Sequence, residues 1–365
     1  FFDDRPEAWP YNPNYDSWWG NDTLPKLSYE DSPELEQYIM DIGKKWVSPP
    51  YNVDGWRLDV AADLGCSNEY NHMFWKRFRK EVKSANPNAL ILAEHYGDPA
   101  EWLQGDEWDS VMNYDAFMEP LTWFLTGMEK HSDERRTDLW GNVDNFVGAM
   151  RHFMASMLTP SLQVAMNELS NHDHSRFLTR TNHIVGRAEH VGSKAAEEGI
   201  NHAVMREAVA VQMTWVGAPT IYYGDEAGQC GFTDPDSRRS YPWGREDKEM
   251  LAFHKEMIRI HKEEKPLRKG SIKLLLGANN LLAYGRFQGD EQIVVVLNNS
   301  KELREVTIPV WLIGVPKYGR MKRLIYSYET GYTTDYDEYI VEDGEVVLNM
   351  GRHSVIVLKP IELPM

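Results

Sequence analysis

The sequence predicts an α/β fold built on a parallel sheet, followed by an antiparallel β-sandwich. Up to about residue 268, short strand-like segments take turns with longer segments of helical period, which is typical of a parallel sheet covered or closed by helices. Beyond that point β-branched stretches follow one another without helices between them, as in residues 292–297, 306–311 and 354–358.

Length and charge narrow the class of protein. The 365 residues are enough for two or three domains. Fifty-six acidic residues against 39 basic ones give a net charge of −17, which argues against nucleic acid as a partner and fits a neutral or cationic small molecule. No run of about 18 apolar residues predicts a membrane span. Two cysteines, Cys66 and Cys230, are too few for a disulfide framework.

The elements follow in order along the chain. Residues 1–30, rich in Pro, Asn, Asp, Tyr and Trp, predict an irregular region. A helix is expected from Ser32, where Ser-Pro-Glu-Leu offers an N-cap with Pro in the first turn. The remaining pattern predicts helices near 68–85, 116–127, 141–158, 201–215 and 247–264, and strands near 53–60, 89–94, 110–114, 161–168 and 218–223.

Three carboxylates lie where predicted strands end, which is where parallel α/β barrels place their chemistry. Asp59 closes one strand, Glu94 closes the next, and Asp173 follows a third. Arg57 shares the face of Asp59, and a guanidinium stabilises an ionised carboxylate, as a nucleophile requires. With Glu94 as proton donor, this is the division of labour of a retaining glycosidase.

Other readings of these residues stay open at this point. A single Asp or Glu is usually a solvated surface residue or a helix cap, and Arg57 with Asp59 could be a structural ion pair. The group His172, Asp173 and His174 could bind a divalent metal, as in a metal-dependent hydrolase.

Four blocks taken together resemble the α-amylase superfamily, glycoside hydrolase family 13. They are residues 54–61 (DGWRLDVA), 93–95 (AEH), 171–173 (NHD) and 217–226 (GAPTIYYGDE), in the family's order. The resemblance implies Asp59 as nucleophile, Glu94 as general acid/base and Asp173 as the third carboxylate, which binds sugar hydroxyls. The further substrate contacts that it implies are Arg57, His172, His95, Tyr96, Lys26, Trp19 and Arg176.

Residues 18–28 further resemble the neopullulanase, cyclomaltodextrinase and maltogenic amylase group, from which Leu24, Ser28 and Ala62-Asp63 depart. The resemblance implies α-glucan oligosaccharides as substrates, no required cofactor, and a structural calcium ion as an open question. Trp18, Trp19, Tyr96, Trp102, Trp108 and Trp243 are candidates for stacking on sugar rings. A homodimer and a cytoplasmic location are expected, with secretion as the alternative.

The resemblance also divides the chain. Residues 1–30 correspond to the end of an inserted domain, 31–268 to the second part of a (β/α)8 TIM barrel, and 269–365 to the sandwich. Only five of the eight barrel strands are placed, and the family's first block is not found. We therefore expect an N-terminal companion segment or chain, and activity only with it. The alternatives are a transglycosylase on the same site, or a fragment that binds sugar without turnover.

Overall fold

The computed structural model describes residues 15–21 and 23–361, which group into two compact units. The first consists of described residues up to Met112 together with Ser156–Ala165, and the second of Asn113–Ala155 and Met166 onward. Residues 1–14 and 22, part of the predicted end of an inserted domain, lie outside the described residues. Within the described residues, no helix is both long and apolar enough to cross a lipid bilayer.

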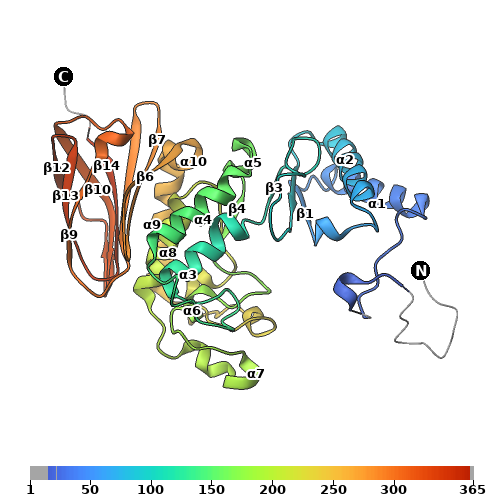
Figure 1. Ribbon diagram of the computed structural model, residues 1–365, viewed down its shortest axis with the longest axis horizontal. Helices are drawn as coiled ribbons and strands as arrows, with labels where there is room; N and C mark the ends of the chain where they lie inside the picture. The colour runs from blue at the N-terminus through green and yellow to red at the C-terminus, as the bar shows by residue number, and fades with distance from the viewer. Residues whose placement is uncertain (1–14, 22, 362–365) are drawn as a thin grey trace. The chain divides into compact units, whose positions relative to one another are not determined.

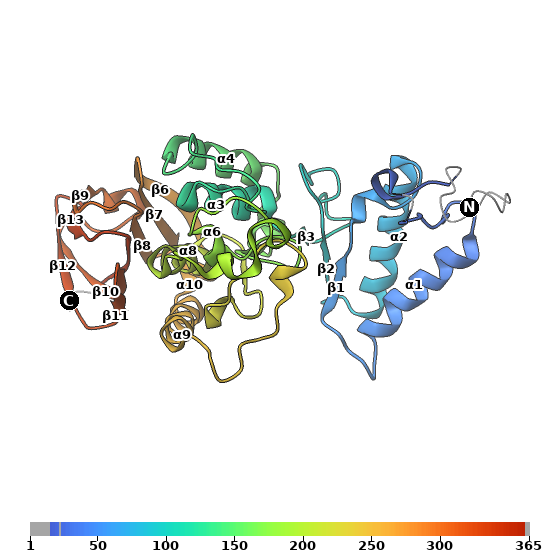
Figure 2. The ribbon, with the colours of Figure 1, turned by 90° about the horizontal axis from the view of Figure 1, so that it is seen from below.

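The first unit is a three-stranded parallel sheet covered by two helices. Its strands are β1 (Gly55–Leu58), β2 (Leu90–Ala93) and β3 (Ser110–Val111), in the order β1-β2-β3. Helices α1 (Pro33–Val47) and α2 (Asn68–Ala85) lie side by side against it, as Figure 2 shows. Because Leu58 pairs with Ala93, the residues that follow these strands, Asp59 and Glu94, leave the same end of the sheet as neighbours.

The helical part of the second unit contains a pair of parallel strands, β4 (Met166–Glu168) and β5 (Ala218–Thr220). Helix α8 (His202–Thr214) is buried from Ala203 to Thr214, as expected for a helix that is covered on every side. The other α-helices of this unit are α3 (Glu119–Thr126), α4 (Val143–Ala155), α6 (Phe177–Arg180), α7 (Ala188–Val191), α9 (Lys248–Glu263) and α10 (Lys265–Lys269) (Figure 1).

The C-terminal part of the second unit is antiparallel, as predicted, but its nine strands are joined in one sheet. The path is β6-β7-β8-β14-β10-β12-β13-β9, with β11 paired to β10. Strand β14 pairs with both β8 and β10, which links the two halves that a sandwich would keep separate. Both halves contribute to one apolar core, from Leu275 in β6 to Leu358 in β14. The strands are β6 (Ser271–Ala278), β7 (Leu281–Gln288), β8 (Glu291–Asn298), β9 (Arg304–Ile308), β10 (Gly319–Tyr328), β11 (Gly331–Thr333), β12 (Glu338–Glu342), β13 (Glu345–Met350) and β14 (Ser354–Pro360).

Three predicted elements differ from those observed. The strand expected over 161–168 begins only at Met166, because Pro160 starts the short helix α5 (Thr159–Gln163). The strand expected over 306–311 ends at Ile308, since Pro309 has no amide hydrogen to continue the ladder. The helix expected over 116–127 is a π-helical turn, Tyr114–Met118, followed by α3.

The five parallel strands form two sheets, one in each unit.

Candidate active site

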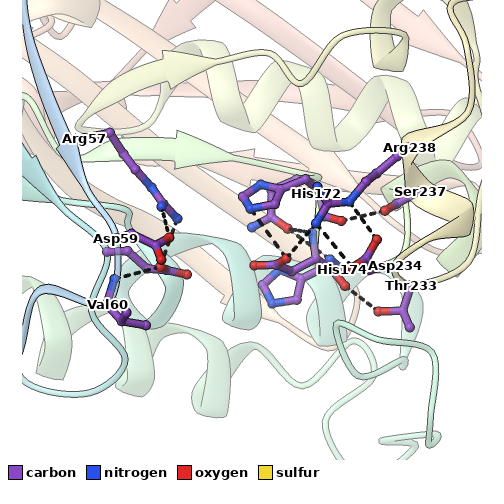
Figure 3. A network of polar contacts seen from close by, with 12 residues as sticks. Arg57, Asp59, Val60, His172, His174, Thr233, Asp234, Ser237 and Arg238 are labelled. Atoms are coloured by element: carbon purple, nitrogen blue, oxygen red, sulfur yellow. Dashed lines mark hydrogen bonds and ion pairs between the residues drawn. The ribbon is translucent and has the colours of Figure 1, made fainter. Parts of the chain in front are cut away.

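In the first unit, one guanidinium group joins the two carboxylates that end neighbouring strands. Nη1 of Arg57 is paired with Asp59 (Figure 3), and Nη2 lies 2.9 Å from Oε2 of Glu94. The two nitrogens belong to one planar fork, so the carboxylates lie beside each other. The Asp59 side chain is 76% exposed, whereas that of Glu94 is buried. One acid is thus open to a ligand and the other is enclosed by protein.

The backbone after Asp59 turns over Glu94. Val60 has the left-handed conformation, with φ of 36°, which a β-branched residue rarely adopts. Its amide donates a hydrogen bond of 3.1 Å to Oε2 of Glu94, and the amide of Ala61 donates one of 3.3 Å to the Glu94 carbonyl. The left-handed turn therefore fixes the chain after the first carboxylate onto the second.

In the second unit, Asp173 lies in a tight turn after β4. Oδ1 of Asn171 accepts the amides of Asp173 (2.9 Å) and His174 (3.0 Å). An asparagine that bonds the backbone two residues on is a common way to hold such a turn. The hydroxyl of Ser237 donates to the His172 carbonyl at 2.8 Å, so a second loop supports the turn from outside.

Charged side chains surround the carboxylate of Asp173. Nη2 of Arg238 and Nε2 of His172 each lie 3.5 Å from its Oδ1 (Figure 3). Arg238 is anchored by a bond of 2.6 Å from Nε to Asp234, which raises the pKa of the guanidinium above its usual value. Asp173 and His172 are both about one-third exposed. The turn thus presents one acid and one imidazole beside a fixed positive charge.

The metal alternative does not fit this geometry. His174 is buried, with its ring against Tyr114 (5.5 Å between centroids) and His131 (4.7 Å). Burial lowers the pKa of His174 well below its usual value. Among residues 15–21 and 23–361, no three His, Cys, Asp or Glu side chains are grouped so that they could hold a metal ion. His172, Asp173 and His174 therefore do not form a ligand set here.

Arg176, predicted as a substrate contact, is fully buried. It donates to the carbonyl of Tyr223 (2.8 Å), the carboxylate of Asp225 (3.0 Å) and the carbonyl of Ser237 (3.0 Å). A guanidinium committed to these groups has no surface for a sugar. This corrects the expectation: Arg176 holds the loops behind Asp173.

The aromatic candidates of the first unit divide into exposed and packed side chains. Trp19 is 79% exposed, and its indole donates to Asp63 at 3.2 Å. Tyr96 is exposed as well. Trp102 and Trp108 are buried and stack on each other at 4.9 Å, so they are part of the core rather than sugar platforms.

The remaining predicted contacts lie as follows. Lys26 pairs with Asp16 at 3.4 Å. His95 packs against the rings of Trp102 and Trp108, at 4.9 and 5.9 Å. The structure thus brings Arg57, Asp59 and Glu94 together in the first unit, and His172 and Asp173 together in the second.

Comparison with known proteins fits this arrangement. Residues 2–270 match the family described as Alpha amylase, catalytic domain. The chain belongs to the α-amylase family. Neopullulanase 2 from Thermoactinomyces vulgaris is 36% identical over 317 residues, covering 85% of this chain and 47% of that protein. A cyclomaltodextrinase from Thermoanaerobacter pseudethanolicus is 33% identical, covering 87% and 49%. The chain thus spans about half the length of the curated relatives that it matches.

Two solved structures are similar over nearly the whole chain. Ttha1563 from Thermus thermophilus has a TM-score of 0.76 at 27% identity, covering 97% of this chain and 68% of that one. The debranching enzyme from Nostoc punctiforme has a TM-score of 0.74 at 25% identity, covering 95% and 65%.

Two residues that the sequence did not single out, Thr233 and Arg238, also belong to the candidate site. Both lie in the loop after β5 and contact the Asp173 turn. The acidic run Asp234-Pro235-Asp236 next to two arginines was the available signal. This run does not show which side chain reaches Asp173.

Proposed function

We propose that this chain carries the catalytic carboxylates of a retaining glycoside hydrolase that cleaves α-1,4-glucosidic bonds in maltodextrins, cyclodextrins or pullulan. The observation that carries the proposal is the single Arg57 guanidinium shared by Asp59 and Glu94. Retaining glycosidases need two carboxyl groups about 5–5.5 Å apart, close enough for one to be a nucleophile. Two acids on one guanidinium fork suit that spacing.

In this proposal Asp59 attacks the anomeric carbon while Glu94 gives its proton to the departing glycosidic oxygen. A covalent glycosyl-enzyme forms on Asp59 as the old bond breaks. Glu94, now ionised, takes a proton from water, whose oxygen attacks the same carbon and releases Asp59. Two inversions at one carbon retain its configuration. The exposure of the Asp59 side chain supports its role as the group that reaches the sugar.

Asp173 and His172 are proposed to bind the hydroxyl groups of the sugar at the cleavage point. A carboxylate held by backbone hydrogen bonds and a neighbouring arginine is preorganised to accept hydrogen bonds from hydroxyls. The proposed substrates follow the names of the relatives, neopullulanase and cyclomaltodextrinase. The same proposal includes a (β/α)8 barrel as the fold that carries Asp59, Glu94 and Asp173.

The test is turnover of maltotriose, β-cyclodextrin and pullulan by this chain, alone and together with the N-terminal companion segment that the resemblance leads us to expect, with product anomers followed by NMR. We expect α-anomers first, and a loss of at least about 1,000-fold in kcat for Asp59→Asn and Glu94→Gln. Asp54→Asn, an exposed residue before the same strand, is the matched control and should keep full activity. Unchanged turnover in either catalytic variant, or β-anomers as first products, would refute the proposal.

Two further outcomes separate the alternatives. Products longer than maltotriose would identify a transglycosylase, in which a second sugar replaces water on the same intermediate. Binding of maltotriose by calorimetry without turnover would identify a sugar-binding chain.

A further inference from the structure

Helix α2 carries a buried amide that contacts the segments following both proposed catalytic strands. Asn71, 1% exposed, uses Nδ2 to approach three carbonyl oxygens: Ala61 at 2.9 Å, Ala62 at 3.2 Å and Leu64 at 2.9 Å. These residues follow Asp59 by two to five positions. One side chain therefore holds the whole turn after the proposed nucleophile.

The other end of the same amide holds the segment after Glu94. Oδ1 of Asn71 accepts the indole N–H of Trp102 at 2.9 Å. Trp102 stacks between the rings of His72 (5.1 Å) and Trp108 (4.9 Å), and His95 packs on its edge. Trp102 thus contacts His95, the residue next to Glu94, and a shift of Trp102 would move His95 with it.

The two segments also meet at the carboxylates themselves, through the bonds from Val60 and Ala61 to Glu94. Residues 60–64 are therefore joined to residues 94–108 at two places, directly at Glu94 and through Asn71 at Trp102. An amide is the side chain that offers donors and an acceptor at once, and inside a dry core these bonds are strong and costly to break.

We propose that Asn71 is a positioning residue that fixes the separation of Asp59 and Glu94. The inference rests on the proposed function, and it identifies the residue that holds the two proposed catalytic carboxyl groups at their separation. About 5–5.5 Å between the carboxyl groups gives the retaining reaction, whereas about 6.5–9.5 Å gives the inverting one, so a shift near 1 Å matters. Displacements of that size cost about 100-fold in rate.

Three variants separate the two arms of this contact. Trp75→Phe removes the indole bond of 2.8 Å to the Ala61 carbonyl but keeps an aromatic ring beside Trp108, so it disturbs mainly the Asp59 side. Trp102→Phe removes the bond to Asn71 and disturbs only the Glu94 side. Asn71→Leu, of similar size and apolar, disturbs both, and Asn71→Ala replaces it if the leucine variant does not fold.

The first measurement is amide hydrogen exchange on the full chain, which needs no turnover. We expect faster exchange in 60–64 for Trp75→Phe, in 95–108 for Trp102→Phe, and in both segments for the Asn71 variant. The proposal would be overturned if the Asn71 variant exchanged faster in only one of the two segments. It would also be overturned if the faster exchange were spread evenly along α2.

The second measurement compares aryl maltosides with good and poor leaving groups. Good leaving groups depart without protonation, so misplacement of Glu94 slows the poor ones more. Trp102→Phe should show this difference and Trp75→Phe should slow both substrates alike. Asn71→Leu should lower kcat about 100-fold with little change in KM. Equal kcat in Asn71→Leu and the wild type would overturn the proposal. If the wild type does not cleave maltosides even with the expected N-terminal companion segment, the proposed function fails, while the exchange pattern still decides whether Asn71 couples the two segments.

Discussion

The hydroxyl group of Thr233 donates a hydrogen bond of 2.6 Å to the main-chain carbonyl of Asp173. Nδ1 of His131 lies 2.7 Å from the same hydroxyl oxygen. Since the hydroxyl proton is already given to Asp173, the imidazole must be the donor, with its hydrogen on Nδ1. The main chain of the turn that carries Asp173 is therefore held by Thr233, which is itself held by His131.

Thr233→Val should weaken this turn. The isosteric variant keeps the volume but leaves the His131 N–H without its partner and the Asp173 carbonyl with only the Asp234 amide at 3.3 Å, at a cost of about 1–3 kcal/mol. Maltodextrin binding, measured by calorimetry, should weaken with it. Thr233→Ser keeps the hydroxyl and serves as the control. Equal affinity in all three proteins would show that Asp173 does not depend on Thr233.

Arg57→Lys should damage activity although it keeps the positive charge. An ammonium is a point charge on a flexible stem and does not hold two carboxylates in a fixed plane as a guanidinium fork does. We expect kcat for maltotriose to fall by about 100-fold. Lys44→Arg, on the exposed face of α1, controls for a change between the two cations. Activity within a factor of about two of wild type would contradict the shared-fork argument.

Glu207→Gln should change stability in a pH-dependent way. Glu207 is buried in α8, neither carboxyl oxygen has a hydrogen-bond partner among the described residues, and burial raises its pKa well above the usual value. The folded protein keeps this proton while the unfolded chain releases it near pH 4.3, so the Glu207 side chain lowers the free energy of unfolding as pH rises beyond that point. The glutamine variant does not titrate.

The thermal midpoint of Glu207→Gln should thus equal that of wild type near pH 4 and exceed it increasingly toward pH 8. The corresponding difference in the free energy of unfolding between the two proteins grows by up to about 1.4 kcal/mol per pH unit, until the folded wild type also releases the proton. A difference that is constant between pH 4 and pH 8 would show that Glu207 does not hold its proton in the fold.

Arg206→Met should destabilise the second unit. Arg206 in α8 donates to Ser327 (3.0 Å) and to the Tyr328 carbonyl (2.8 Å) in β10, and burial lowers its pKa. Removing it leaves buried acceptors unpaired, which costs about 1–3 kcal/mol in urea unfolding. Arg320→Met breaks an exposed ion pair with Glu338 on the same sheet and should cost no more than about 1 kcal/mol. Equal costs for both variants would contradict a special role for Arg206.

Local pattern was enough to predict the proposed catalytic carboxylates and most of the elements around them. Asp59 and Glu94 follow short strands whose apolar runs and turn signals lie within a few residues, and α2 begins and ends where its helical period predicted. The π-helical turn at Tyr114 has no such local signal, since it differs from an α-helix only in its hydrogen-bond spacing.

Contacts between distant segments explain what the sequence did not disclose. Arg238 reaches Asp173 across 65 positions, and Asn71 reaches Trp102 across 31. The burial of Arg176 likewise depends on loops that fold around it. The helix and strand periods of a sequence do not indicate which distant residue a polar side chain contacts. The domain boundaries at residues 30 and 268 remain predictions for the same reason.

The left-handed Val60 has a consequence for any attempt to engineer this protein. A β-branched residue in that conformation costs about 1–3 kcal/mol, and glycine would adopt it without strain. Selection for thermal resistance alone would therefore favour replacing Val60, and would do so at the peptide that ties the proposed nucleophile to its partner acid. Because the hydrogen bond to Glu94 comes from the main-chain amide of residue 60, Val60→Gly would keep that bond while removing the strain, so this position can be stabilised without breaking the link between the two acids.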